Sequence, residues 1–339
     1  MENKKNLLVT LADKKFLPQA KQLFSSVYWN AGWDGDYMLL GAEIPEEELW
    51  WFYDKKILVK KCKTLYDKNI GADKFPPLVL DLFYLFTPEF RKWKNIVFLD
   101  ADIIVRASLE SLTKVKGFAS PNILGDKLFL FFCKDADIQQ YKMLEANYDL
   151  NVTPFNSGVI AFSTDIIKDD TFDQLMNLFY TYENINSGND PILNLLFYKK
   201  WKKLPIVYDI TPKTISKYTG LNADKLQGII MHLKDDELSD EKYAFYKEWK
   251  LNLEKAENID LKKTPKAKKW SAFRITYYSG VIKTRYFLYL FKISTFPKIR
   301  IKLKSGILYI IYLPDRCAGK AGSLLKKHYP ALYKKLKKN

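Results

Sequence analysis

Several residue types are scarce in this chain of 339 residues, and each scarcity excludes a class of protein. The three cysteines, Cys62, Cys133 and Cys317, lie far apart and form no Cys-x-x-Cys pair, which argues against a disulfide framework and against a cysteine-rich zinc site. No apolar run approaches the roughly 20 residues of a transmembrane helix. We therefore expect a protein of the reducing cytosol, in which the apolar stretch Asn6–Leu11 is a first strand rather than part of a signal peptide.

Acidic residues are scarce in one part of the chain only. The whole sequence has 55 Lys and Arg against 39 Asp and Glu, a formal net charge of +16. From Asp260 to Asn339 there are 21 basic residues and two acids, so this part has a net charge of +19 and residues 1–259 one of −3. We therefore divide the chain into a balanced domain, residues 1–259, and a basic C-terminal extension, residues 260–339, with the lysine-rich segment Lys262–Lys269 as a linker.

The extension also contains thirteen aromatic residues from Trp270 onward, mixed with lysines. This mixture is typical of segments at a membrane interface, where each cation near an anionic surface adds about 1 kcal/mol. Ordinary packed helices or strands with solvated lysines are the alternative. Nucleic-acid binding also uses basic and aromatic surfaces, but the sequence has no RNP, KH or zinc-finger pattern, and we expect no nucleic-acid partner. The extension therefore predicts peripheral association with an anionic membrane surface.

Strand and helix patterns alternate along the balanced domain. The strand patterns are Asn6–Leu11, Asp36–Gly41, Ile57–Cys62, Asn95–Leu99, Phe155–Phe162 and Gly228–His232. The helix patterns are Leu17–Trp29, Ile44–Asp54, Leu78–Phe86, Asp170–Tyr182, Pro191–Tyr198 and Glu241–Glu257. This alternation predicts an α/β fold with a mainly parallel sheet flanked by helices, in which ligands bind beyond the carboxyl ends of the strands.

A pair of carboxylates follows the fourth of these strands. Asp100 and Asp102 flank Ala101, so both side chains are expected in one cleft, where hard oxygen ligands favour Mg²⁺ or Mn²⁺ and leave positions for substrate phosphates. A surface turn can produce such a pair by chance. His232 ends the apolar strand Gly228–His232 and could add a nitrogen ligand, which shifts the preference toward Mn²⁺; a half-buried, hydrogen-bonded histidine is the alternative.

Two polar clusters lie farther along the chain. In the strand pattern Phe155–Phe162, Gly158 permits close approach of a ligand and Asn156 offers a donor and an acceptor to sugar hydroxyls, although a simple bulge would look the same. Asn189 and Asp190 precede Pro191 at the start of a helix pattern, where capping alone would explain them.

Five motifs in order resemble glycosyltransferase family 8, the family of glycogenin and of bacterial lipopolysaccharide galactosyl- and glucosyltransferases. They are TLAD at 10–13, FLDAD at 98–102, FNSGVI at 155–160, NDPILN at 189–194 and IIMH at 229–232, and the resemblance covers residues 6–249. It implies a GT-A fold, a mixed and mainly parallel sheet that binds a nucleotide-sugar, usually a UDP-sugar, with Mn²⁺ on its diphosphate. Mg²⁺ is a second possibility. It also implies transfer of the sugar with retention of anomeric configuration.

The resemblance assigns roles to single residues. It places Asp13 on the uracil ring, Asp100 near the ribose, and Asp100, Asp102 and His232 on the metal. The remaining residues that it implies for nucleotide-sugar binding are Thr10, Leu11, Ala12, Ala101, Asn156 and Ser157.

The chain departs from the family pattern at three points. Asn189 and Asp190 stand where the family has Asp-Gln beside the anomeric carbon, and we expect them to be catalytic. The H-x-x-G-x-x-K-P-W ending is missing after His232, so we expect Lys234 to contact the diphosphate, with Lys242 as an alternative. The family's basic residue on the helix before the D-x-D strand has no clear match, since Leu78–Phe86 offers only Asp81.

The expected function is transfer of a hexose from a UDP-sugar to a glycan or glycolipid of the lipopolysaccharide or capsule type. The basic extension predicts that the enzyme is cytoplasmic and peripheral on the inner face of the membrane. The alternatives are a member of the same family that glycosylates protein, and a degenerate membrane-surface scaffold without activity.

Overall fold

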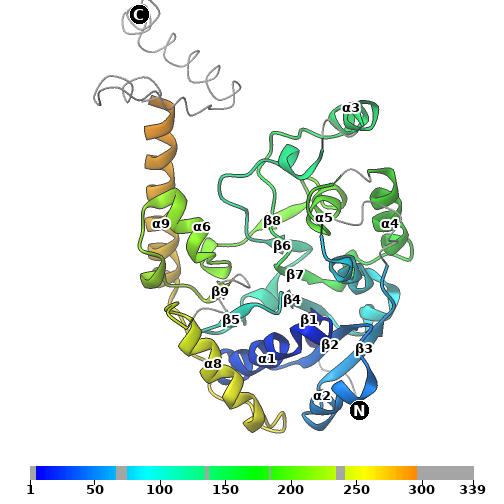
Figure 1. Ribbon diagram of the computed structural model, residues 1–339, viewed down its shortest axis with the longest axis vertical. Coiled ribbons are helices and arrows are strands. Elements are labelled where there is room, and N and C mark those ends of the chain that lie inside the picture. Colours follow the sequence, from blue (N-terminus) through cyan, green and yellow to red (C-terminus); the bar gives the residue numbers. More distant parts are fainter. Residues whose placement is uncertain (1–4, 66–74, 134–136, 183–184, 234–240, 296–339) are drawn as a thin grey trace, which may run out of the picture.

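A computed structural model describes residues 5–65, 75–133, 137–182, 185–233 and 241–295. A seven-stranded sheet crosses the molecule in the order β3-β2-β1-β4-β7-β6-β8 (Figure 1). Its strands are β1 Asn6–Ala12, β2 Asp36–Ala42, β3 Leu58–Cys62, β4 Asn95–Leu99, β6 Phe118–Ser120, β7 Val159–Ser163 and β8 Trp201–Lys203. All run in one direction except β7, which is antiparallel to both neighbours. The mixed, mainly parallel sheet expected from the sequence is confirmed.

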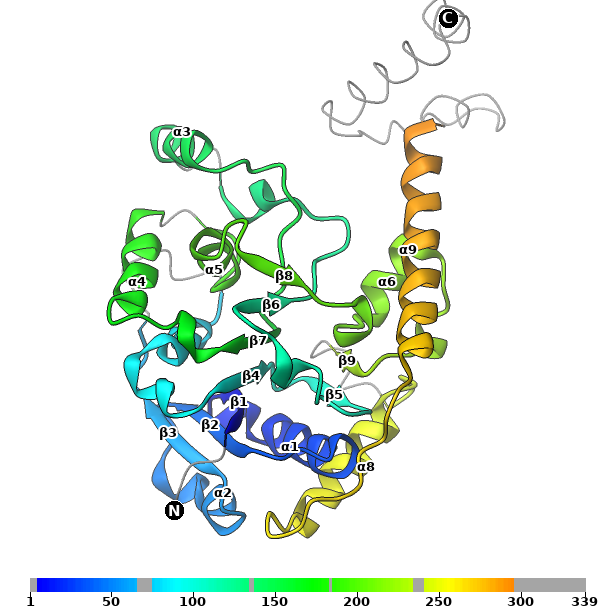
Figure 2. The ribbon, with the colours of Figure 1, turned by 180° about the vertical axis from the view of Figure 1, so that it is seen from behind.

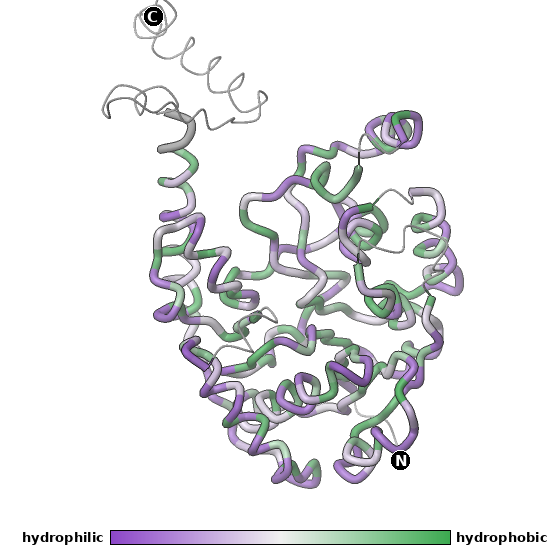
Figure 3. Tube along the Cα trace, in the orientation of Figure 1, coloured by the Kyte–Doolittle hydropathy of each residue, from purple (hydrophilic) through white to green (hydrophobic). Residues whose placement is uncertain are grey.

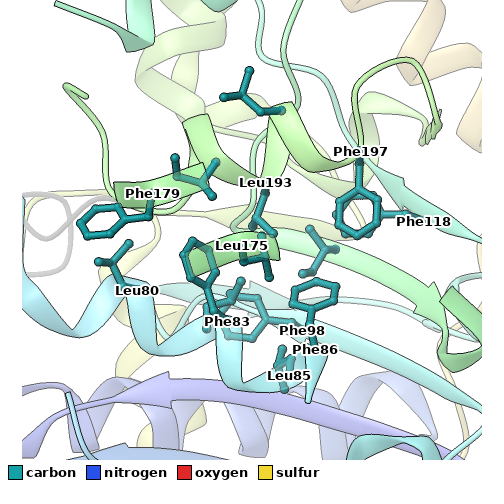
Figure 4. Close-up of a cluster of buried hydrophobic side chains, with 14 of the residues drawn as sticks. Leu80, Phe83, Leu85, Phe86, Phe98, Phe118, Leu175, Phe179, Leu193 and Phe197 are labelled. Atoms are coloured by element: carbon teal, nitrogen blue, oxygen red, sulfur yellow. The ribbon is translucent and has the colours of Figure 1, made fainter. Parts of the chain in front are cut away.

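Both faces of this sheet are buried, which explains the continuous apolar runs of its central strands. Successive residues of β4 show the alternation, since Ile96 and Phe98 face one core cluster whereas Val97 and Leu99 face the other. The first cluster is rich in phenylalanine and includes Leu80, Phe83, Leu85, Phe86, Phe98, Phe118, Leu175, Phe179, Leu193 and Phe197 (Figure 4). The two cores hold the strands, and hence their carboxyl ends, in fixed register.

Helix α1 packs on one face of the sheet and α4 and α5 pack on the other, whereas the remaining helices lie around the sheet or beside it. The bounds of the helices are as follows. They are α1 Leu17–Ala31, α2 Trp50–Asp54, α3 Ile138–Asn147, α4 Thr171–Thr181, α5 Asp190–Leu196, α6 Pro212–Thr219, α8 Tyr246–Lys255 and α9 Ala272–Thr295, with 3₁₀ segments that include η1 Lys14–Phe16, η3 Pro77–Phe86 and η8 Ile206–Tyr208. Helix α1 has Pro18 in its first turn, and Gly32, the residue that caps its C-terminus, has a left-handed backbone conformation with φ +57°. A side chain at Gly32 would also meet the backbone of Ala267 at 2.8 Å.

Several sequence predictions differ from the structure in detail. The helix predicted over Glu241–Glu257 is α only over Tyr246–Lys255. Leu78–Phe86 is a 3₁₀ segment rather than an α-helix, and the helix predicted over Ile44–Asp54 is α only from Trp50. The strand predicted from Phe155 begins at Val159, because residues 156–158 use side chains in place of a strand ladder: Asn156 Oδ1 accepts a bond from the Gly158 amide at 2.9 Å. The intrinsic preference of each residue for helix or strand does not reveal these effects of tertiary contacts and side-chain hydrogen bonds.

The first part of the basic extension lies against the domain. The Lys268 amide donates to the Asn30 carbonyl at 2.8 Å, and the Ser108 amide donates to the Lys268 carbonyl at 2.8 Å. The predicted linker is therefore held by hydrogen bonds to α1 and to Ser108, while the division of the chain at residue 259 stays a prediction.

Helix α9 extends beyond the domain in both views (Figures 1 and 2). Its middle packs beside α6, where Ile282 is buried and the ring of Tyr218 contacts those of Tyr286 and Tyr289. Its other side carries exposed apolar side chains. The coloured part of its trace alternates between hydrophobic and hydrophilic residues (Figure 3). Those side chains are Phe273, Tyr277, Phe287, Leu288, Leu290 and Phe291, which we call the α9 face. Within the described part of the chain, α9 included, we find no helix with the length and apolar character that a bilayer crossing requires.

Candidate active site

The candidate site lies where β4 ends and β7 begins. Asp100 directly follows β4, and its amide donates to the Gly158 carbonyl at 2.9 Å, which fixes the Asp100-Ala101-Asp102 turn beside the start of β7. Because β7 alone runs antiparallel, its beginning rather than its end lies at the edge where β1 and β4 finish. The motifs at 98–102 and 155–160 therefore meet at one edge of the sheet.

A second, two-stranded sheet brings in the histidine. Strand β5, Ile103–Val105, starts immediately after Asp102 and pairs antiparallel with β9, Ile230–His232. The register sets His232 opposite Ile103, and the Leu233 amide donates to the Asp102 carbonyl at 3.0 Å. A separation of 130 residues in sequence thus becomes direct contact between the histidine and the two aspartates.

The spacing of these three side chains suits a metal ion. His232 Nε2 lies 3.2 Å from Asp102 Oδ1 and 3.7 Å from Asp100 Oδ2, and one ligand atom from each residue falls within 4.8 Å of the other two. Adjacent ligands of an octahedral ion with bonds of about 2.1 Å are about 3 Å apart, close to the shorter distance. The separations therefore fit one small divalent cation held by all three residues.

Two further observations support the fit. Asp102 Oδ1 is buried and accepts no hydrogen bond from any described residue, although Nε2 lies beside it. The other imidazole nitrogen, Nδ1, lies 2.9 Å from Asp209 Oδ1. A proton on Nδ1 satisfies that contact and leaves the lone pairs of Nε2 and Oδ1 facing one another, an arrangement that needs a cation or a second proton between them. Gly158 supplies the room, because a Cβ there would meet His232 Cε1 at 2.5 Å and Asp100 Oδ2 at 2.6 Å.

The electrostatics of the cluster agree with this arrangement. Loss of solvation raises the pKa of Asp100 to about 7; His232 opposes the shift, and the carboxylates of Asp102, Asp190 and Asp209 add to it. Burial alone would lower the pKa of His232, but Asp102 and Asp209 raise it well above 6.5. Four carboxylates thus surround one imidazole, and without a metal the cluster retains protons that a divalent cation would displace.

The second pair of motifs also meets here. The Ser157 amide donates to Asp190 Oδ1 at 2.7 Å, and the Ser157 hydroxyl donates to Asn189 Oδ1 at 2.9 Å. Asp190 is the first residue of α5, and neither it nor Asn189 caps that helix with its side chain. The capping alternative is therefore wrong for Asp190, whose carboxylate reaches across to the 156–158 turn. Loss of solvation raises its pKa, against the hydrogen bonds from Ser157.

The remaining predicted residues lie at or near the same edge. Strand β1 ends at Ala12, and Thr10 and Ala12 are fully buried, with Thr10 Oγ1 unpaired among the described residues. Asp13 follows and caps η1 by accepting from the Phe16 amide at 3.1 Å. Lys234, predicted for the diphosphate, lies outside the described residues.

The sequence analysis missed Asp209. This side chain is 6% exposed, lies directly after η8, and accepts from Asn156 Nδ2 at 3.1 Å through its second oxygen. The short apolar run Ile206–Tyr208 before it gives no strand signal, so nothing local placed this acid at the site. The contact with Asn156 also shows that the amide predicted to bind the donor sugar is already engaged by the protein on both of its polar atoms.

Comparison with known proteins agrees with the motifs and the fold. The chain is 31% identical over 171 residues to glycosyltransferase GlyB of Streptococcus pneumoniae serotype 4, a match that spans 45% of this chain and 36% of GlyB. The structure resembles the galactosyltransferase LgtC in complex with donor and acceptor sugar analogues, at a TM-score of 0.56 and 12% identity over 73% of this chain and 95% of LgtC. It also resembles the bifunctional glycosyltransferase WbbM, at 0.55 and 16% over 77% of this chain and 52% of WbbM.

The chain spans about a third of GlyB and half of WbbM, so these likenesses concern one portion of each. The structural matches establish the GT-A fold. The family model described as glycosyl transferase family 8 matches residues 7–234, about two thirds of the sequence and all five motifs. The chain therefore belongs to glycosyltransferase family 8.

Proposed function

We propose that this glycosyltransferase moves a hexose from a UDP-sugar to a glycan or glycolipid acceptor, with Mn²⁺ held by Asp100, Asp102 and His232. The observation that carries the proposal is the convergence of these ligands at the carboxyl end of β4, beside the end of β1. Bound Mn²⁺ would offset the charge of the diphosphate as UDP leaves. Thr10, Leu11, Ala12 and Asp13 would line the base pocket, and Lys234 would contact the diphosphate.

Asp190 is the proposed catalytic carboxylate. Its oxygen accepts from the Ser157 amide, which holds it beside the turn that also carries Asn156 and Gly158. A carboxylate at this position could stabilise positive charge that develops at the anomeric carbon, or it could attack that carbon and form a covalent glycosyl intermediate. Both routes are compatible with retention. Asn189, which accepts from the Ser157 hydroxyl, would keep this turn in place.

The proposal is tested first by binding. We expect UDP and Mn²⁺ together to raise the melting temperature more than either alone, and Asp102→Asn to remove the contribution of Mn²⁺ while the metal-free melting temperature stays near that of the wild type. Hydrolysis of UDP-galactose and UDP-glucose would then identify the donor, and the anomeric configuration of the product by NMR would test retention. A wild-type protein that binds neither UDP nor Mn²⁺ would instead support the inactive scaffold.

A peripheral site of action at an anionic membrane is the second part of the proposal. It is supported by the α9 face, with Phe273 79% exposed and Phe287 65% exposed, on a helix within the basic extension, residues 260–339, which has a net charge of +19. Apolar rings would enter the headgroup region while lysines and arginines approach anionic lipid. Such placement suits an acceptor that is itself anchored to lipid.

A further inference from the structure

The carboxylate of Asp209 contacts both halves of the candidate site. One oxygen, Oδ1, lies 2.9 Å from Nδ1 of His232, and the other, Oδ2, accepts from Asn156 Nδ2 at 3.1 Å. Among the described residues, no other side chain forms hydrogen bonds both to His232 and to the 156–158 turn. Asp209 therefore joins the metal-ligand cluster to the segment that adjoins Asp190.

The backbone holds Asp209 firmly in this position. The next residue, Ile210, donates its amide to the Ile230 carbonyl at 3.0 Å, and its carbonyl accepts from the His232 amide at 2.8 Å. Asp209 itself donates its amide to the Ile206 carbonyl at 2.9 Å. The segment after η8 thus runs alongside β9, and its register fixes the acid beside the histidine before any ligand binds.

We propose that Asp209 is a positioning residue that sets the tautomer and orientation of His232 for metal binding and couples that orientation to Asn156. A carboxylate that accepts from Nδ1–H leaves the lone pair of Nε2 directed toward Asp100 and Asp102, as outer carboxylates do for many metal-binding histidines. The same side chain restrains Asn156, whose oxygen holds the Gly158 amide beneath the ligands. The proposal rests on the proposed metal site.

The test measures the affinity of the full-length protein for Mn²⁺ alone, by titration calorimetry, in wild type, Asp209→Ala and Asp209→Asn. We expect Asp209→Ala to weaken Mn²⁺ binding by about 10- to 100-fold. Asp209→Asn keeps an oxygen that can accept from Nδ1–H, and we expect it to recover most of that loss. Asp36→Ala is the matched control: Asp36 also accepts from a ring N–H, that of Trp93 at 2.7 Å, but it stands at the first residue of β2, far from the carboxyl ends.

A spectroscopic measurement separates positioning from general stability. The sequence has only two histidines, so ¹⁵N-histidine NMR of the Mg²⁺-bound protein, with His328→Gln to assign the spectrum, should show His232 protonated on Nδ1 in the wild type and in Asp209→Asn. In Asp209→Ala we expect the Nδ1 proton of His232 to exchange with water faster, because the carboxylate that accepts from it is gone.

The outcomes are distinct. If wild-type protein does not bind Mn²⁺, the proposed metal site is wrong. If the wild type binds Mn²⁺ and Asp209→Ala binds it equally well, or if Asp36→Ala loses as much affinity as Asp209→Ala, the positioning role of Asp209 is wrong. Should Asp209→Ala fail to fold, the NMR spectrum of Asp209→Asn decides, because a His232 that is not protonated on Nδ1 there overturns the proposal.

Discussion

Replacement of Gly158 by alanine should disable the metal site with little other change. The added Cβ would lie 2.5 Å from His232 Cε1 and 2.6 Å from Asp100 Oδ2, whereas ordinary contacts of a Cβ begin near 3.4 Å. Each ligand must therefore move by about 0.8–0.9 Å, and a misplacement of about 1 Å costs on the order of 100-fold in rate. The backbone of Gly158 does not have a positive φ, so alanine brings no conformational strain of its own.

The assay combines three measurements on Gly158→Ala. We expect turnover to fall by about 100-fold and Mn²⁺ affinity to fall by at least about tenfold, because two ligands are displaced together. The free energy of unfolding should fall by only about 1–3 kcal/mol, the usual cost of overpacking. Gly280→Ala on α9 is the control, since a Cβ there meets nothing within 4 Å among the described residues. A Gly158→Ala protein with wild-type Mn²⁺ affinity and turnover would refute the geometry of the site.

Three further predictions concern Asp190, the buried Asp81 and the α9 face. Asp190→Asn keeps the shape of the side chain but removes its charge, and we expect turnover to fall by at least about 100-fold, or about 3 kcal/mol of transition-state stabilisation, with UDP affinity nearly unchanged; near-normal turnover would exclude a catalytic role. Asp81 is fully buried, and burial raises the pKa of its carboxyl to about 6. The stability contributed by the protonated carboxyl is therefore fully present below pH 4 and is lost as pH rises through 6. Asp81→Asn should stabilise the protein at pH 7.5 by up to about 3 kcal/mol and have little effect near pH 4, as measured by urea unfolding at both pH values. Replacement of both Phe287 and Phe291 by serine should weaken binding of the full chain to anionic vesicles, and added salt should weaken wild-type binding by screening the charges. Wild-type binding to neutral vesicles as strong as that to anionic vesicles would contradict the contribution of charge.

The parts of the fold that the sequence predicted correctly are those with strong local signals. Strands β1, β2 and β4 carry long apolar runs that end at turns, and helix α1 has proline near its start and glycine at its end, so their bounds differ from the predicted ones by only a few residues. The short strands β5, β6 and β8 have three residues each and were not predicted, because three residues carry too little periodicity. Strand β9 is equally short and was predicted only as part of the longer apolar run Gly228–His232. The site depends on one of these, since pairing with β5 sets His232 opposite Ile103, next to Asp102.

The difference between strong and weak local signals also explains which site residues the sequence could predict. Asp100 and Asp102 follow a strong strand, and His232 ends one, so chemical type and position along the chain were enough to suggest them. Asp209 and Gly158 act through three-dimensional register: the first reaches His232 because residues 209–210 run beside β9, and the second leaves space because β7 is reversed in the sheet. The neighbouring sequence gives no sign of Asp209. It does mark Gly158 as a place where a ligand could approach closely, but not its packing against His232 and Asp100. The contacts that these two residues make with the metal ligands are therefore visible only in the structure. Variants of Asp209 and Gly158 test that structure more directly than variants of the ligands do, because the motifs alone already suggest the ligands.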